Sequence, residues 1–364
     1  MRRAIRLALV AVVAAELLLA AYLWLPMLAR QPSPAMEERH YITLVIRDPE
    51  GRVVEEKTYE TRSFTYVEVL AARLLSTWFL RTTTMWESSI RISTPLVVLD
   101  SYGNYVSTSG PAEPLSDNYN YYVHPSLVFL GSGTSPDGGR RLGSPLGVSA
   151  APSVGYTYDS QWFNVTVTAA FSFSEGATVS EAMLATTFYD GAYLSVVYDS
   201  FPPVSVPAGG SLTVQWVFAW KDYGAFTENW GKLWQYALTL NAGVTSQYIV
   251  FTDDAGAAAT IPWPNRYSGA TVALRLAWGT GTSPMSRSSY RLQSETGSVQ
   301  AGFSVVGTGL SVGGAVGSPA SEVGLYWLAR GADGNAHRIL LMRWVPGYTL
   351  PAGTTVNIYV TKGG

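Results

Sequence analysis

The chain contains one short stretch twice: Gly131-Ser132-Gly133-Thr134-Ser135-Pro136 returns as Gly279-Thr280-Gly281-Thr282-Ser283-Pro284. The same landmarks follow each copy in the same order. They are Ser180-Glu181 and Ser321-Glu322, Asp190-Gly191 and Asp333-Gly334, and Pro207-Ala208-Gly209 and Pro351-Ala352-Gly353. The offset is 148 residues at the first landmark and 141 at the glutamates. A near-constant offset indicates an internal duplication, and its small drift is typical of loop insertions between fixed strands.

The duplication extends upstream more faintly. Residues 97–103 resemble 249–256, and Ser63-Phe64-Thr65 and Ala225-Phe226-Thr227 each open a helical pattern. Each unit therefore reads as a strand, a short helix and a run of strands. We place the first unit at 40–222 and the second at 223–364.

Composition limits the classes of partner and chemistry. Charged residues make up 14% of the chain and aromatics 13%, with 35 Gly and 20 Pro, which favours strands and tight turns. The formal net charge is −2, so the chain lacks the excess of positive charge that is typical of nucleic-acid-binding proteins. The absence of Cys excludes disulfides and thiol catalysis. The three histidines, His40, His124 and His337, are too scattered for a zinc site.

The N-terminus predicts a membrane anchor. Three arginines within the first six residues precede an apolar run from Leu7 to Ala29, which is interrupted by Glu16 and contains Trp24 near its end. About 23 helical residues span roughly 34 Å, enough to cross a bilayer. The arginines favour a cytoplasmic tip, so residues 1–30 form a signal anchor and the bulk lies outside the cell. A cleaved signal peptide is the alternative, with a shorter apolar run and a small-residue cleavage site.

Local patterns predict the first elements after the anchor. Residues 31–39 form a Pro-rich linker, because each Pro fixes its own φ. Alternation predicts a hairpin from Tyr41–Ile46 and Val53–Tyr59, and 3.6-residue spacing predicts a helix near 63–78. A second short amphipathic helix includes Trp230 and Leu233.

The remaining sequence predicts strands joined by turns. Residues 101–120 are polar and predict a surface loop. Asp190-Gly191 and Asp333-Gly334 predict hairpins with two-residue connections, and Gly209 and Gly353 precede the last strand of each unit. The expected fold is mainly β: a transmembrane helix, then two tandem antiparallel β-sandwich units, each with one short amphipathic helix.

No pattern for catalysis or cofactor binding stands out. Glu181 and Glu322 occupy matching positions in the repeated set of motifs, which we call the cassette. They could pair as acid and base, but backbone N–H groups in a loop are the favoured partners. Asp100, Asp253 and Asp254 could bind calcium or form turns, and they offer too few oxygens for calcium. The Gly-x-Gly-Thr cassettes lack the Lys of a phosphate loop. We expect no enzyme, no cofactor and no metal.

Aromatic residues and one sequon are the remaining candidates for recognition. Trp263, Trp278, Trp327 and Trp344 could stack on sugars or fill the sandwich cores. Asn164-Val165-Thr166 is the single glycosylation sequon.

The order of short motifs resembles a loose group of virion and tail-type structural proteins of phages and archaeal viruses. In the second unit the motifs are Gly-Thr-Gly-Thr-Ser-Pro (279–284), Ser-Glu-Val-Gly-Leu (321–325) and Pro-Ala-Gly-Thr-Thr-Val (351–356). The first unit departs from them, with Ala182-Met183 where the pattern has Val-Gly, and the membrane anchor also departs. The resemblance implies a non-enzymatic building block of a virion or cell surface.

Together these features predict a membrane-anchored surface or virion protein that assembles or adheres. Its expected partners are the lipid bilayer, further copies of itself and other surface proteins. The alternative is an extracellular glycan-binding module that uses exposed aromatics.

Overall fold

A computed structural model of the chain describes residues 38–61, 96–109, 125–159, 161–189, 192–222, 224–239, 247–263, 273–306 and 309–360. These residues form a mainly β protein with several antiparallel sheets and one α-helix, so the mainly β prediction is confirmed. No described helix has the length and apolar character needed to cross a bilayer. The predicted span with Leu7, Glu16, Trp24 and Ala29 lies outside the described residues, as does most of linker 31–39.

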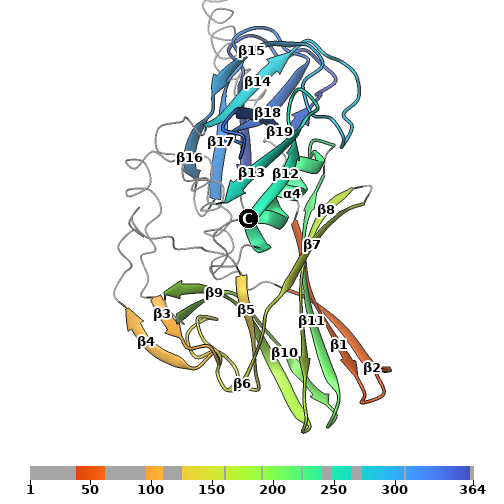
Figure 1. Cartoon of the computed structure of the whole chain (residues 1–364), viewed down its shortest axis with the longest axis vertical. Helices are drawn as coiled ribbons and strands as arrows, with labels where there is room; N and C mark the ends of the chain where they lie inside the picture. The colour runs from red at the N-terminus through yellow and green to blue at the C-terminus, as the bar shows by residue number, and fades with distance from the viewer. Residues whose placement is uncertain are drawn as a thin grey trace, which may run out of the picture.

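The first half of the described chain, 38–222, forms two sheets (Figure 1). Sheet A contains, in order across it, β2 (Val53–Glu60), β1 (Glu38–Arg47), β11 (Ser211–Lys221), β8 (Trp162–Ser172) and β7 (Ser153–Tyr158). Sheet B contains β4 (Tyr105–Ser109), β3 (Leu96–Leu99), β10 (Ala192–Val206), β9 (Ala177–Tyr189), β5 (Pro125–Gly131) and β6 (Pro145–Ala150).

Alternating side chains build a core between these two sheets. Leu44 of β1 and Val165 of β8 belong to the same buried cluster as Val128 of β5 and Leu184 of β9. In β8 every second residue from Phe163 onward is buried while its neighbours are more exposed, as expected for a strand with one solvated face. The first half is therefore β-sandwich-like.

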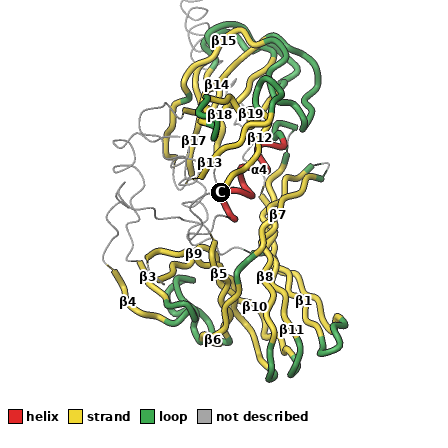
Figure 2. Tube along the Cα trace, viewed as in Figure 1, coloured by secondary structure: helices red, strands yellow, loops and turns green. Residues whose placement is uncertain are grey.

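The second half, 224–360, begins with the helix α4 (Glu228–Thr239) and continues in strands. Sheet C contains β15 (Glu295–Gln300), β14 (Ala273–Gly279), β18 (Glu322–Arg330) and β19 (Ala336–Trp344). Sheet D is the hairpin β12 (Gln247–Thr252) with β13 (Ala258–Trp263), and sheet E contains β16 (Gly302–Val306), β17 (Gly309–Ala315) and β20 (Thr355–Val360). Figure 2 shows α4 as the helix between the two groups of strands.

The second half repeats strand orders of the first. The order β6-β5-β9-β10 in sheet B corresponds to β15-β14-β18-β19 in sheet C. The order β11-β8-β7 in sheet A corresponds to β20-β17-β16 in sheet E. The register agrees as well, because Glu181 lies opposite Gly131 and Glu322 lies opposite Gly279.

Two features differ between the halves. The hairpin β1–β2 extends sheet A beyond β11, while in sheet E the described residues place no strand beyond β20. Hairpin β3–β4 joins sheet B through β10, whereas hairpin β12–β13 contacts β19 without a continuous ladder.

The turns correct two expectations. Residues 101–120 were expected to form a loop, but Tyr105–Ser109 is strand β4, because its Tyr, Val and Thr side chains suit a strand that pairs with β3. Asp333-Gly334 lies in a five-residue connection, 331–335, and not in a two-residue one. Asp190-Gly191 and the helix expected near 63–78 lie outside the described residues.

Candidate functional site

Glu181 is the centre of the cassette in the first half. Its side chain is fully buried, and Oε1 accepts hydrogen bonds from the N–H groups of Gly133 (3.0 Å) and Ser144 (3.0 Å). Oε2 accepts from Gly143 N–H (3.0 Å) and from the Tyr198 hydroxyl (2.9 Å). Burial, together with this bond to Glu181, raises the pKa of Tyr198 to about 12.

Glu322 makes the equivalent contacts in the second half. It is fully buried, and its carboxyl oxygens accept from the N–H groups of Gly281 (3.2 Å), Gln293 (3.1 Å) and Ser294 (2.7 Å). The fourth partner differs, because Arg343 donates from Nε (2.9 Å) where the first half has a tyrosine hydroxyl. Arg343 and Tyr198 lie at matching positions, each opposite the residue two after the glutamate.

The repeated glycines make room for these carboxyl groups. A Cβ added at Gly131 would lie 2.4 Å from Oε1 of Glu181. A Cβ added at Gly279 or Gly281 would lie 2.8 or 2.4 Å from Oε1 of Glu322. Such distances are far below van der Waals contact, so the glycines and the buried glutamate form one structural unit. We call each unit a glutamate clasp.

Each clasp holds a loop against the outer face of a sheet. Leu142, in the loop that follows β5, packs with Met183 in a small buried cluster, and Leu292 packs with Tyr326 in the matching cluster of the second half. A Cβ added at Gly324 would lie 2.8 Å from Leu292. Gly324 is the counterpart of Met183, and no side chain of that kind fits there. The larger Tyr326 packs against Leu292 instead, and its hydroxyl accepts a hydrogen bond from Leu292 N–H (2.8 Å).

The clasps explain the recurrence of the two glutamates without catalysis. Each carboxyl accepts its hydrogen bonds within its own half, and neither has exposed surface for a substrate. These hydrogen bonds from loop N–H groups are the contacts that we predicted for Glu181 and Glu322 from the sequence. The acid–base hypothesis for Glu181 and Glu322 has no geometric support.

Two of the three candidate calcium ligands, Asp100 and Asp253, order turns with their carboxylates, whereas Asp254 pairs with Arg338 (3.1 Å). Asp100 Oδ1 accepts from the N–H groups of Tyr102 (2.8 Å) and Asn104 (2.9 Å). Asp253 Oδ1 accepts in the same way from Ala255 (3.0 Å) and Ala257 (2.8 Å). Among the described residues no group of three or more His, Cys, Asp or Glu side chains could hold a metal ion.

His337 joins two hairpin turns. Its Nδ1 lies 3.0 Å from Asp253 Oδ2, and its Nε2 lies 3.2 Å from Asp333 Oδ1. Burial opposes the charged imidazole, but the hydrogen bonds and charges of the two aspartates raise the pKa of His337. The pKa of Asp333 falls to about 2, chiefly through the backbone N–H of Asn335.

A further buried acid was not singled out from the sequence. Asp199 of β10 accepts hydrogen bonds from the Thr61 hydroxyl and from Trp216 Nε1, the latter at 2.8 Å. Burial raises the pKa of Asp199 above its usual value, against the effect of these two donors. The residues are widely separated in sequence, so no local motif marks the site.

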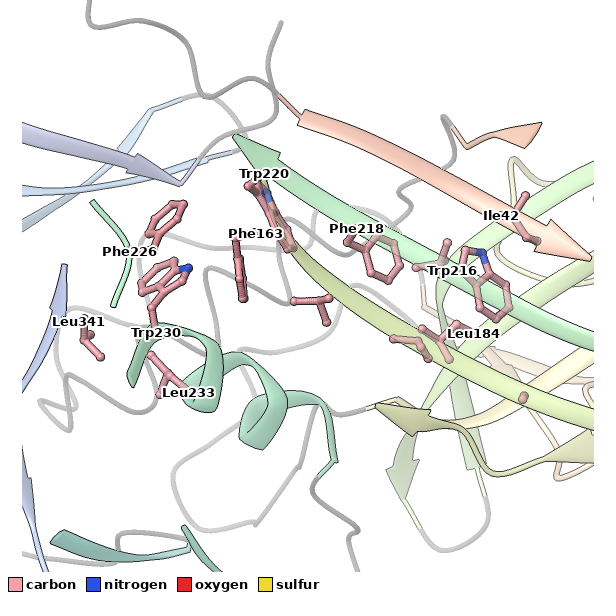
Figure 3. Close-up of a cluster of buried hydrophobic side chains, with 14 of the residues drawn as sticks. Ile42, Phe163, Leu184, Trp216, Phe218, Trp220, Phe226, Trp230, Leu233 and Leu341 are labelled. Carbon is pink, nitrogen blue, oxygen red and sulfur yellow. The ribbon is translucent and has the colours of Figure 1, made fainter. Parts of the chain in front are cut away.

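The two halves share one hydrophobic core, which passes through α4 (Figure 3). Phe163 of β8 stacks on Trp220 and contacts Phe226, with ring centroids 5.9 Å apart in both pairs. Phe226 in turn stacks on Trp230 of α4 at 5.2 Å. Leu341 of β19 belongs to the same buried cluster, so apolar contact runs without a break from sheet A to sheet C.

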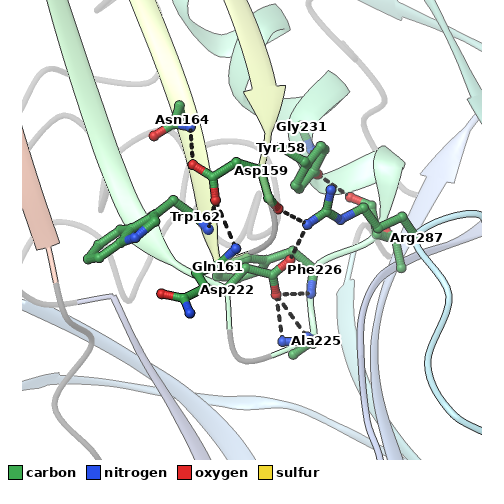
Figure 4. A network of polar contacts seen from close by, with 12 residues as sticks. Tyr158, Asp159, Gln161, Trp162, Asn164, Asp222, Ala225, Phe226, Gly231 and Arg287 are labelled. Atoms are coloured by element: carbon green, nitrogen blue, oxygen red, sulfur yellow. Dashed lines mark hydrogen bonds and ion pairs between the residues drawn. The ribbon is translucent and has the colours of Figure 1, made fainter.

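Polar contacts surround this junction (Figure 4). The Tyr158 hydroxyl donates to the Thr227 carbonyl and accepts from Gly231 N–H (3.1 Å). Arg287 of the second half lies over the Tyr158 ring, with Cζ 4.5 Å from its centroid. The same guanidinium donates to the Asp159 carbonyl and lies 3.5 Å from Asp222 Oδ2.

Asp222 and Thr227 order the segment between the halves. Asp222 Oδ1 accepts from the N–H groups of Gly224 (2.8 Å) and Ala225 (3.0 Å). The Thr227 hydroxyl lies 2.8 Å from the Leu340 carbonyl of β19. Sequence reasoning marked the start of this helix but not its partners. Residues 222–224 read Asp-x-Gly, a local pattern typical of such a turn.

The comparisons with known proteins give no relative. No family model, no curated protein and no solved structure matches the chain.

The aromatic candidates divide between core and surface. Trp278 and Trp327 are buried, and Trp278 Nε1 donates to Ser318 Oγ (3.0 Å), so the sugar-binding hypothesis is wrong for these two. Trp344 is 36% exposed and nearby Tyr348 61% exposed. The side chain of Trp263 lies outside the described part of the structure.

The remaining predicted residues lie in turns and on one strand. Gly209, Gly334 and Gly353 adopt positive φ in turns, while Gly191 lies outside the described residues. Pro136 and Pro284 lie in the two loops held by the clasps. Asn164 lies within β8, half-buried, with Nδ2 3.4 Å from Asp159 Oδ2, and whether it carries a glycan stays a prediction.

Proposed function

We propose that the chain is a non-catalytic structural protein of a cell surface or virion, anchored in a membrane by residues 1–30. Linker 31–39 leads to two tandem β-sandwich units, 40–222 and 223–364, which assemble with further copies or adhere to other surface proteins. The shared strand orders and the paired glutamate clasps support the two-unit description.

The observation that carries this proposal is the continuous core at the junction. Two units joined by a loose linker would move independently, but here Phe226 and Trp230 bury apolar surface against both halves. A large apolar interface between units disfavours relative motion. A stiff, elongated body suits a spacer or building block.

Electron microscopy and sedimentation of the purified full-length chain test the proposal. We expect particles in which both units keep one fixed relative orientation and which associate as the concentration rises. Single chains at every concentration, or units at variable angles, would contradict it. For the anchor, we expect deletion of residues 1–30 to release the protein from the membrane fraction, and continued sedimentation with membranes would contradict that part.

Glycan binding remains the second candidate, and one observation favours it. Trp344, the last residue of β19, and Tyr348, four residues further along the chain, both expose aromatic surface. Aromatic faces of this kind stack on sugars. A glycan array probed with the native chain and with Tyr348→Ala tests it: binding that the substitution abolishes would support the role, and no binding to any sugar would remove it.

A further inference from the structure

Among the described strands, β20 lies at an edge of its sheet. Within the described part of the chain it pairs with β17 alone, in a register that sets Thr355 opposite Ala315 and Val360 opposite Leu310. The corresponding strand of the first half, β11, lies between β8 and β1 and is paired on both sides. The Pro-Ala-Gly turns before the two strands fix their correspondence.

The inward side chains of β20, which has no second neighbour among the described strands, are less buried than those of β11. Leu212 and Val214 of β11 are both 0% exposed. Their counterparts, 144 residues later, are Val356 and Ile358, which pack on the core but remain half-buried. In sheet A the neighbouring strand β1 adds Ile42 and Leu44 to the buried cluster, and sheet E has no described equivalent.

The sequence of β20 carries none of the usual protection of an edge strand. Residues 355–360 contain no charged residue, no Pro and no Gly. Edge strands usually carry such residues because they prevent pairing with another chain. Edge strand β2, by contrast, carries Glu55, Glu56, Lys57 and Glu60, and edge strand β6 begins at Pro145 and contains Gly147 at φ +70°.

We propose that β20 pairs edge to edge, antiparallel, with β20 of a second copy of the chain. This inference rests on the assembly function proposed above and names the surface that makes the contact. Sheets E of two copies would join into one continuous sheet about a two-fold axis. Such a contact needs a surface that complements itself, and an uncharged strand meets this condition because no like charges come to lie opposite each other.

Single cysteines test this contact, because the native chain contains no Cys. Residues 355–358 are each changed to Cys in the full-length chain, which is then oxidised. Residues directly opposite in an antiparallel pair lie about 4.5–5.5 Å apart, within reach of a disulfide. We expect disulfide-linked dimers with a maximum at the position nearest the two-fold axis.

Thr213→Cys is the matched control. Thr213 occupies in β11 the place of Asn357 in β20, but it lies between two paired strands. We expect it to give no dimer above background. Yields along β20 no higher than at Thr213 would overturn the inference.

A charge on the edge tests the same contact in solution. Asn357 is exposed on β20, so Asn357→Lys leaves the fold intact and sets like charges near each other in the pair. We expect self-association, measured by sedimentation, to weaken at least about tenfold, with Thr213→Lys as the control and a mixture of Asn357→Lys and Asn357→Asp restoring it. Circular dichroism confirms the folding of each variant.

The outcomes separate this inference from the proposed function. If oligomers persist in Asn357→Lys and the cysteine variants show no maximum along β20, another surface joins the copies. That result overturns the β20 contact but leaves the proposed assembly in place. A native chain that stays single at all concentrations overturns both.

Discussion

At the scale of single residues, the two clasps place the same carboxyl group among different partners. Both glutamates accept three backbone N–H groups, but Glu181 meets a neutral hydroxyl and Glu322 a guanidinium. Arg343 is itself buried and makes an ion pair with Glu322 at 2.8 Å. A buried charge that loses its partner is much more costly than a buried hydroxyl that keeps an acceptor.

We therefore predict that Glu322→Gln destabilises the protein more than Glu181→Gln. The loss at Glu322 should be about 3–5 kcal/mol, because Arg343 would stay buried without a counter-charge. The loss at Glu181 should be about 1–3 kcal/mol, because the amide oxygen still accepts from Tyr198. Urea unfolding measures both, with Glu50→Gln on the surface as the control. Equal losses would contradict this account.

A second prediction at this scale concerns pH and His337. The folded state raises the pKa of His337, so its stabilising effect is complete below its usual value of 6.5 and disappears as pH rises through the folded-state pKa. Asp253 and Asp333 have lowered pKa values, so their effect persists above 3.8 and is lost as pH falls.

We expect the native chain to lose stability between pH 6 and 9 more steeply than His337→Gln. Thermal unfolding from about pH 5.5 to 9 is the measurement, and the two curves should differ most at the low end of this range, where the imidazole is charged. Parallel curves would show that the imidazole does not titrate between Asp253 and Asp333.

At the scale of elements, one hairpin design recurs. Asp48, Asp100 and Asp253 each accept the N–H of the residue four places on, and the glycine between them has a positive φ. The turns differ in their surroundings: a Cβ at Gly51 meets nothing within 4 Å, but at Gly103 it lies 3.0 Å from buried Phe129.

Gly103→Ala should therefore cost more than Gly51→Ala. At Gly51 the cost is backbone strain alone, about 1–2 kcal/mol. At Gly103 the same strain is joined by displacement of the Phe129 ring from a packed cluster, about 1–3 kcal/mol more. Chemical denaturation of the two variants measures the difference, and an equal cost would mean that Phe129 yields freely.

At the scale of the whole molecule, the junction joins the two halves of the described chain through one hydrophobic core. Because a single core spans both halves, we expect the native chain to unfold in one calorimetric transition. Phe226→Ala removes the ring that links Phe163 to Trp230 and should cost about 3–5 kcal/mol. It should also split the transition in two.

Phe251→Ala is the control for the junction. Phe251 is fully buried within the second half, where it packs on Trp327. Phe251→Ala should lower the stability of the second half, but the two halves should not separate into two calorimetric transitions as they do in Phe226→Ala. Two transitions already present in the native chain would contradict the shared core.

Local sequence patterns predict the recurrence of the glutamate motif and many of the strands and turns, but not strand β4 or the five-residue connection at 331–335. Alternation in Phe163–Thr168 and the Pro-Ala-Gly turns depend on neighbouring residues, so local chemistry predicts them. The partners of Glu181, Asp199 and Arg287 lie 17 or more residues away along the chain, and they are known only from the folded structure. The same is true of the edge that no other described strand pairs with. Pairing across such distances depends on how the sheets stack, and no local pattern records it.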